Sequence, residues 1–241
     1  MEAARNSRRT PSPRLVDDPP VAARPLSAAE RRSFILENTR LQRPPHTPEI
    51  QLHLADEITP IWRMTEEALG EMGVPPPFWA FAWAGGQALA RYVLDHPDVV
   101  RGRRVIDFAA GSGLVGIAAM KAGASHGLCA DIDDFCAAAV ALNAEVNGVV
   151  LDFTAGNLLD APPPAVDVIL AGDISYENPL AGRVRAWLAE AHARGSVVLL
   201  GDPRRSYFAT EGLEPLAEYQ VETTRELEDF AVKRTGVWTF A

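Results

Sequence analysis

Short apolar segments and helical segments alternate in a regular order along the second half of the chain. From Arg103 onward, strand-like segments are followed by stretches with helical spacing that end near Lys121, Asn147 and Gly195. The apolar segments that we expect to be strands are Val105–Phe108, Gly127–Ala130, Val149–Thr154, Val166–Ala171 and Val197–Leu200. Strands that alternate with helices are typical of a parallel, doubly wound α/β sheet.

The C-terminal pattern differs, because two extended segments follow each other almost directly. Tyr219–Leu227 and Phe230–Phe240 are separated by Glu228 and Asp229, and this link is too short for a crossover helix. We therefore expect an antiparallel hairpin that closes the sheet. Five parallel strands closed by a hairpin make a seven-stranded α/β sheet, a layout that resembles Rossmann-like class I methyltransferases more than a classical dinucleotide fold.

The first 95 residues follow a less regular pattern. Residues 1–26 are rich in arginine and proline, so we expect a disordered leader rather than an organelle-targeting helix. Residues 27–95 are expected to form a helical and aromatic extension that packs on a core at 96–241.

Within that extension, Ser27 and Glu30 form a capping-box signature that predicts a helix to about Arg40. A short strand is expected at Glu49–Leu54, and helices at Ile61–Met72 and from about Gly86 to Asp95. Three prolines precede the segment Phe78–Trp83, in which aromatic residues alternate as they would on one face of a buried strand.

Composition and charge limit the classes of function that the sequence supports. The formal net charge is -9, which argues weakly against a nucleic-acid partner. No run of about 18 apolar residues occurs, so no membrane helix is expected. The histidines are scattered, and Cys129 and Cys136 match no metal or redox spacing, so we predict no metal and two buried thiols.

The segment from Val105 to Gly116 carries the strongest chemical signal. It places the pattern G-x-G-x-x-G, formed by Gly111, Gly113 and Gly116, between a predicted strand and a predicted helix. Such a turn suits NAD as well as S-adenosylmethionine. Asp107 favours the second, because a carboxylate near the helix N-terminus repels a pyrophosphate and attracts a cationic ligand. We therefore predict S-adenosylmethionine as the cofactor, with Asp107, Gly111 and Gly113 in its site.

Two further strand ends carry candidate cofactor ligands. Asp131 follows the second strand, where a carboxylate can accept both ribose hydroxyls, and the neighbouring Ile132 would pack on the adenine. Asn157 and Leu158 follow the third strand, where the amide would hold the adenine amino group. The alternatives are a helix N-cap for Asp131, although Asp133 or Asp134 suits that position better, and a turn residue for Asn157.

Two other motifs, taken with the glycine loop, resemble a known family. Phe78–Leu89 reads F-W-A-F-A-W-A-G-G-Q-A-L, and Gly172–Tyr176 reads G-D-I-S-Y. Both are similar to family 16 methyltransferases, and within that family to the lysine methyltransferases of the electron transfer flavoprotein β subunit. Pro48–Leu52 and Leu200–Pro203 share the resemblance, which covers about residues 34–241.

The resemblance implies a protein-lysine N-methyltransferase. Trp83 and Gly85 would lie against the cofactor, and Asp173 and Tyr176 would be the catalytic residues that line the methyl-acceptor channel. For Asp173 the alternative is a cap on the helix that follows the fourth strand. Ala109 stands where such loops usually have a further glycine, and its methyl group is tolerated there if φ is negative.

The implied methyl acceptor is the electron transfer flavoprotein β subunit, with a ribosomal stalk protein as the second choice. Other acceptors stay open, namely another ribosomal protein or a small amine such as nicotinamide. More distant alternatives are an NAD(P)-dependent oxidoreductase and a non-catalytic binding module. We expect a monomer with no nucleic-acid or membrane partner. Lys121 and Lys233 are the only lysines, which favours a bacterial source and the cytoplasm, whereas a eukaryotic homologue would be mitochondrial.

Overall fold

The computed structural model describes residues 24–241 except 57–58, 65, 73 and 224–230. Apart from its last three residues, the predicted leader at 1–26 lies outside the described residues, as does the predicted turn at Glu228 and Asp229. The first described helix begins with the expected capping box. The amide of Glu30 donates to the Ser27 hydroxyl (3.3 Å), and the amide of Ser27 donates to the Glu30 carboxylate (2.8 Å).

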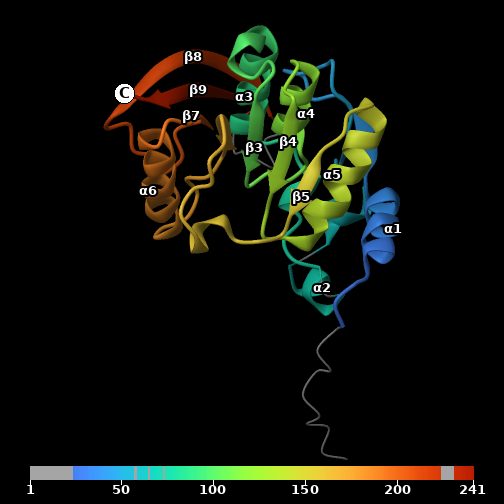
Figure 1. The fold of residues 1–241 in the computed structure, drawn as a ribbon. Coiled ribbons are helices and arrows are strands. Elements are labelled where there is room, and N and C mark those ends of the chain that lie inside the picture. Colours follow the sequence, from blue (N-terminus) through green and yellow to red (C-terminus); the bar gives the residue numbers. More distant parts are fainter. Residues whose placement is uncertain (1–23, 57–58, 65, 73, 224–230) are drawn as a thin grey trace, which may run out of the picture.

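A seven-stranded sheet runs through the molecule in the order β5-β4-β3-β6-β7-β9-β8 (Figure 1). Its strands are β3 (Arg104–Phe108), β4 (His126–Ala130), β5 (Asp152–Thr154), β6 (Val168–Gly172), β7 (Val197–Asp202), β8 (Leu213–Glu222) and β9 (Val232–Phe240). Strands β3 to β7 pair in parallel, and β9 pairs antiparallel with β7 and β8. The predicted fold class is confirmed. The strand order reverses between β3 and β6, where ligands bind in such sheets.

The eighth strand begins earlier than the sequence pattern predicts. β8 starts at Leu213 and ends at Glu222, whereas the expected segment was Tyr219–Leu227, whose last residues lie outside the described part. A register shift between Pro215 and Ala217 interrupts the alternation of inward and outward side chains. Proline is tolerated here because β8 is an edge strand. The first half of the strand therefore carries no clear period-2 pattern.

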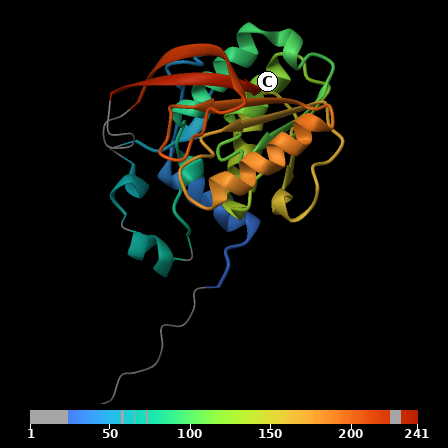
Figure 2. The ribbon, with the colours of Figure 1, turned by 90° about the vertical axis from the view of Figure 1, so that its left-hand side faces the viewer.

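Helices cover both faces of the sheet. The helices are α1 (Ala28–Asn38), α2 (Glu66–Glu71), α3 (Ala84–Asp95), α4 (Leu114–Lys121), α5 (Asp134–Asn147) and α6 (Leu180–Ala193). Neighbouring residues of a strand point to opposite faces. Val105 and Leu170 therefore pack in one core with α3 and α4, and Ile106 and Ile169 pack in another with α6. Figure 2 shows α6, in orange, lying along its face of the sheet.

The extension at 27–95 is more broken than predicted. The expected helix at Ile61–Met72 divides into a 3₁₀ turn at Pro60–Arg63 and the short α2. The expected strand at Glu49–Leu54 is reduced to β2 (Leu52–Leu54), which pairs antiparallel with β1 (Arg40–Gln42).

The reading of Phe78–Trp83 as a buried strand is wrong. Phe78–Ala80 forms a 3₁₀ turn, and Trp83 is the N-cap of α3. The amides of Phe78 and Ala80 donate to the carbonyls of Pro76 (2.8 Å) and Pro77 (2.9 Å). These local bonds use the donors that a strand would offer to a neighbour.

The glycine loop after β3 contains one residue that departs from expectation. Ala109 has φ +55°, so the condition under which its methyl group is tolerated, a negative φ, is not met. Gly111 (φ +50°) and Gly113 (φ +78°) share this left-handed conformation, which glycine adopts without steric cost. In an alanine the left-handed conformation costs about 1 kcal/mol or more, because the Cβ atom crowds the backbone.

Ala109→Gly should therefore stabilise the fold. We expect the free energy of unfolding to rise by roughly 0.5–1 kcal/mol, since the relief of strain exceeds the entropy that glycine loses on folding. Urea unfolding of the two proteins measures this difference. The control is Ala138→Gly, which lies inside α5 and should lose about 1 kcal/mol. A loss of stability in Ala109→Gly would contradict the assignment of strain.

Candidate active site

A cavity of about 520 Å³ opens at the carboxyl ends of the parallel strands. Nine of the predicted site residues line it, from the loops after β3, β4, β5 and β6 and from the start of α3. They are Trp83, Ala109, Gly111, Asp131, Ile132, Asn157, Leu158, Asp173 and Tyr176. The cavity lies at the reversal of strand order, where the fold places a ligand site.

Three of the predicted cofactor residues are not among the residues that line the cavity, namely Gly85, Asp107 and Gly113. Gly85 is packed against the end of β7, and a Cβ there would clash with the carbonyl of Gly201. Gly113 is the N-cap of α4, and a Cβ there would lie 3.0 Å from Val140. These two glycines allow close packing behind the wall of the cavity. Direct contact of the three residues with a cofactor stays a prediction.

Asp131 is fixed by two backbone donors. The amide of Gly111 donates to its Oδ2 (2.9 Å), and the amide of Asp133 donates to its Oδ1 (3.0 Å). The N-cap of α5 is Asp133, whose carboxylate accepts from the amide of Phe135 (2.8 Å). The alternative of an N-cap role for Asp131 is therefore wrong, and its carboxylate faces the cavity with lone pairs left for further donors.

Asn157 fits its alternative interpretation as a turn residue and also lines the cavity. Its side-chain oxygen accepts from the amide of Leu159 (3.2 Å), and its nitrogen donates to Asp160 (2.9 Å). The side chain therefore caps a 3₁₀ turn. A role in binding adenine would use the remaining capacity of its oxygen or nitrogen.

Asp173 joins three elements at one end of the cavity. Its Oδ2 accepts from the amide of Gly86 in α3 (2.8 Å), and its Oδ1 accepts from Nη2 (2.6 Å) and Nε (3.0 Å) of Arg205. Its own amide donates to the carbonyl of Gly201 (2.9 Å), with φ at +57°. The N-cap of the following helix is Pro179, so the proposed cap on that helix is wrong. Asp173 instead caps the first turn of α3.

Aromatic rings form one wall beside Asp173. Phe78 lies 6.0 Å from both Trp83 and Tyr176, measured between ring centroids. The indole of Trp83 donates to the carbonyl of Phe78 (2.9 Å). Burial, with Glu177 and Asp131 nearby, raises the pKa of Tyr176, so its hydroxyl stays protonated at neutral pH. Trp79, from the same segment, is fully buried and stacks on Phe135 instead of lining the cavity.

Sequence comparisons agree with this architecture. Residues 87–184 match the model of the ribosomal protein L11 methyltransferase family. The chain is 40% identical to the electron transfer flavoprotein β subunit lysine methyltransferase of Xenopus laevis, over 89% of this chain and 88% of that protein. The chain belongs to this lysine methyltransferase family. The human relative is 36% identical, over 88% of this chain and 82% of that protein.

A solved structure shares the fold of this methyltransferase. A candidate RNA methyltransferase from Pyrococcus horikoshii has a TM-score of 0.50 and is 16% identical, over 68% of this chain and 88% of that one. In the part of the methyltransferase that the structure describes, no helix is long and apolar enough to cross a membrane. No group of His, Cys, Asp and Glu side chains suited to a metal ion occurs among those residues either.

Two residues of the site were not predicted from the sequence. Phe78 was quoted only as part of a family motif, although it is 53% exposed at the rim of the cavity and an exposed aromatic is a signal for binding. Arg205 lies two residues beyond the G-D-P segment at Gly201–Pro203 and was not singled out. An arginine just after a strand that ends at the ligand edge of the sheet was the available signal.

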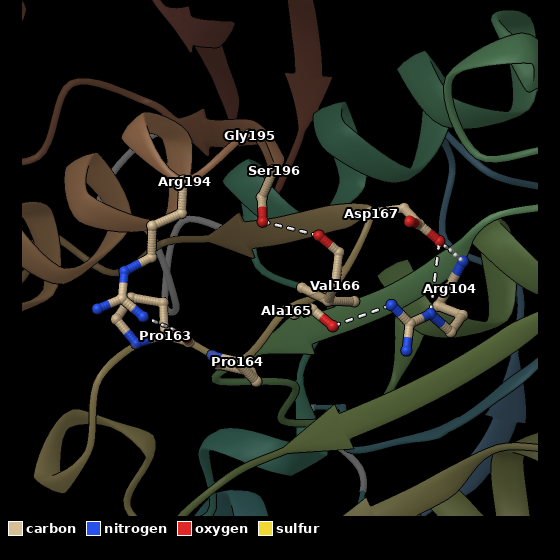
Figure 3. A pocket seen from close by; sticks show the side chains of 9 residues that line it. All are labelled: Arg104, Pro163, Pro164, Ala165, Val166, Asp167, Arg194, Gly195 and Ser196. Atoms are coloured by element: carbon tan, nitrogen blue, oxygen red, sulfur yellow. Dashed lines mark hydrogen bonds and ion pairs between the residues drawn. The ribbon is translucent and has the colours of Figure 1, made fainter.

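A second hollow, of about 290 Å³, lies at the amino ends of β3, β6 and β7 (Figure 3). Arg104 donates to the carbonyl of Ala165 (2.9 Å), and Ser196 donates to the carbonyl of Val166 (2.7 Å). These polar groups hold neighbouring loops together. The hollow is at the edge opposite the one where ligands bind in this fold.

Asp107 is buried beneath the glycine loop, with 2% of its surface exposed. Its Oδ2 accepts from the amide of Gly116 (2.7 Å), in the first turn of α4. Burial raises the pKa of Asp107 to about 8, although the bond from Gly116 opposes the rise. An unfolded aspartate titrates near pH 3.9. Between about pH 4 and 8 the folded state therefore keeps a proton that the unfolded state has released, so this group makes stability fall as pH rises.

Asp107→Asn should make the stability of the fold depend less on pH. We expect the decline in unfolding free energy from pH 5 to pH 8 to be smaller than in the wild type, by up to about 1.4 kcal/mol per pH unit. Chemical denaturation at several pH values, without cofactor, measures the slope. Asp98→Asn is the control, because its side chain is 90% exposed and its removal should leave the slope unchanged. Equal slopes in the wild type and Asp107→Asn would disprove the assignment.

Proposed function

We propose that this methyltransferase transfers a methyl group from S-adenosylmethionine to a lysine side chain of the electron transfer flavoprotein β subunit. The observation that carries the proposal is the 40% identity to an enzyme of that name over 89% of this chain. A match that leaves out only about a tenth of the chain includes most of the extension at 27–95 and the loops after β3 to β7, which line both sides of the cavity.

The cavity suits S-adenosylmethionine in size and in chemical groups. Its volume of about 520 Å³ is in the ordinary range for small-molecule sites. The fixed carboxylate of Asp131 can accept the two ribose hydroxyls, and Ile132, which is 73% exposed, can cover the adenine. The first turn of α4 also disfavours a pyrophosphate, because the amide of Gly116 is already bonded to Asp107. This contact supports S-adenosylmethionine over NAD(P).

When bound, S-adenosylmethionine supplies a methyl group that is already activated by its sulfonium. The protein's own contribution is then to align the acceptor nitrogen with the methyl carbon and to exclude water. Asp173, held by Gly86 and Arg205, is the group that can accept a hydrogen bond from the acceptor nitrogen. The rings of Phe78, Trp83 and Tyr176 can surround the lysine stem and contact the cationic methylated product.

A ribosomal protein is the second candidate acceptor. The match of residues 87–184 to the L11 methyltransferase model favours it. That match leaves out the residues before 87 and after 184. It therefore omits Phe78, Trp83 and Arg205, which line the proposed acceptor side of the cavity, and it also omits the hairpin. The electron transfer flavoprotein β subunit therefore comes first in the test. Mass spectrometry of each purified substrate after incubation with enzyme and S-adenosylmethionine separates the two candidates, and labelling of neither would reject the proposal.

Asp173→Asn should abolish most of the methyl transfer. We expect kcat on the identified substrate to fall about 100-fold or more, because alignment of the nucleophile is lost, while S-adenosylhomocysteine affinity changes less than about threefold. Asp152→Asn, which is exposed and remote, is the control. Turnover close to wild type in Asp173→Asn would remove this residue from the acceptor site.

Asp131→Asn should act on the cofactor instead. We expect the Kd for S-adenosylhomocysteine, measured by calorimetry, to rise about 10-fold or more, since a hydrogen bond to a carboxylate is worth about 1.5–3 kcal/mol. Asp134→Asn tests the specificity of the effect, because Asp134 pairs with Arg31 outside the cavity. An unchanged Kd in Asp131→Asn would contradict the proposed ribose contact.

A further inference from the structure

Arg205 is held in the wall of the cavity by contacts at both ends of the residue. Its amide donates to Oδ1 of Asp202 (2.7 Å), which fixes the turn after β7. Its guanidinium donates two N–H groups to Oδ1 of Asp173 and lies 5.6 Å from the ring centre of Trp83. The side chain is 17% exposed, and the Asp173 side chain is 11% exposed. A planar fork held in this way fixes the carboxylate more tightly than a single donor would.

This contact addresses a difficulty in the proposed chemistry. The acceptor lysine must present a neutral amine, whereas a free lysine amine has a pKa of about 10.4. A lone carboxylate beside the amine would raise that pKa further, because it favours the ammonium form. A permanent cation next to the same carboxylate acts in the opposite direction.

We propose that Arg205 is the positioning residue of the methyl-acceptor site, where it orients Asp173 and, through its positive charge, favours the neutral amine of the incoming lysine. The inference rests on the proposed function and assigns to one residue the lowering of the lysine pKa, so that the amine releases its proton to solvent before methyl transfer. An amine hydrogen-bonded to Asp173 would lie within about 6 Å of the guanidinium. At that separation, with an effective dielectric constant of about 20, two like charges shift a pKa by about one to two units.

Among the described residues, the other titratable groups that face the pair are acidic side chains and a tyrosine. Asp202, at the end of β7, interacts with both Asp173 and Arg205 and is itself buried, which raises its pKa to about 7. Tyr176 lies on the same wall, and the nearby charges of Glu177 and Asp131 contribute to its raised pKa. The start of α3 contributes the backbone amide of Gly86. Ionised acids in this set would favour the ammonium form of the acceptor lysine, whereas the positive charge of Arg205 disfavours it.

The test is the pH profile of single-turnover methyl transfer at saturating substrate, which reports the ionisation of the bound acceptor. In the wild type, the acidic limb should lie well below pH 10.4. In Arg205→Gln, which removes the charge, the limb should move up by about one to two pH units. In Arg205→Lys, which keeps the charge but loses the fork, the limb should stay within about half a unit while the rate falls several-fold.

Arg204→Gln is the matched control. Arg204 is the preceding residue on the same turn, but its guanidinium lies over Trp238 and it does not line the cavity. Its replacement should leave the pH profile of methyl transfer unchanged. A merely structural role for Arg205 would lower the rate in Arg205→Gln without moving the limb.

The inference is overturned if Arg205→Gln keeps the wild-type limb, or if Arg205→Lys moves it as far as Arg205→Gln does. If Arg205→Gln does not fold, the wild type alone still decides, since an acidic limb near pH 10 would overturn the inference. Failure of the proposed function is a separate result, in which the wild-type enzyme binds S-adenosylhomocysteine but labels no lysine on the flavoprotein subunit.

Discussion

Backbone touches backbone where the start of α3 meets the ends of β6 and β7, and the proposed acceptor site depends on this contact. A Cβ on Gly85 would clash with the carbonyl of Gly201, and a Cβ on Gly201 would clash with that of Gly85. A Cβ on Gly172 would lie 3.0 Å from the backbone of Gly86. Only glycine allows three backbone segments to approach so closely. Any larger residue at Gly85 or Gly201 would push α3 away from the sheet.

The close approach explains why Asp173 and Trp83 lie together although they are far apart in sequence. With α3 against the strand ends, the amide of Gly86 reaches the carboxylate of Asp173 at 2.8 Å. Trp83, as the N-cap of the same helix, is then placed on the wall of the cavity. Arg205 completes the arrangement from the turn after β7. The proposed acceptor side is therefore built from the ends of three elements, and the proposed cofactor side from the loops after β3, β4 and β5.

The sequence predicted those parts of the molecule that depend on local patterns. The alternation of strands and helices fixed the class of fold, and the strand ends gave Asp131 and Asp173, since carboxyl ends of parallel strands share one edge. Parts that depend on tertiary contacts could not be predicted in the same way. The capping of α3 by Asp173 and its pairing with Arg205 join residues 87 and 32 positions apart, which no periodicity reports. Ala109 shows a further limit, because neighbouring contacts can impose a left-handed backbone on a residue that disfavours it.

The most direct test of this account is a crystal structure of the methyltransferase with S-adenosylhomocysteine. The account predicts that the ligand fills the cavity at the carboxyl ends of β3 to β6. Its ribose hydroxyls should donate to Asp131, and its sulfur should face the wall formed by Asp173, Trp83 and Tyr176. A ligand bound outside this cavity, or one whose sulfur faces away from Asp173, would contradict the account.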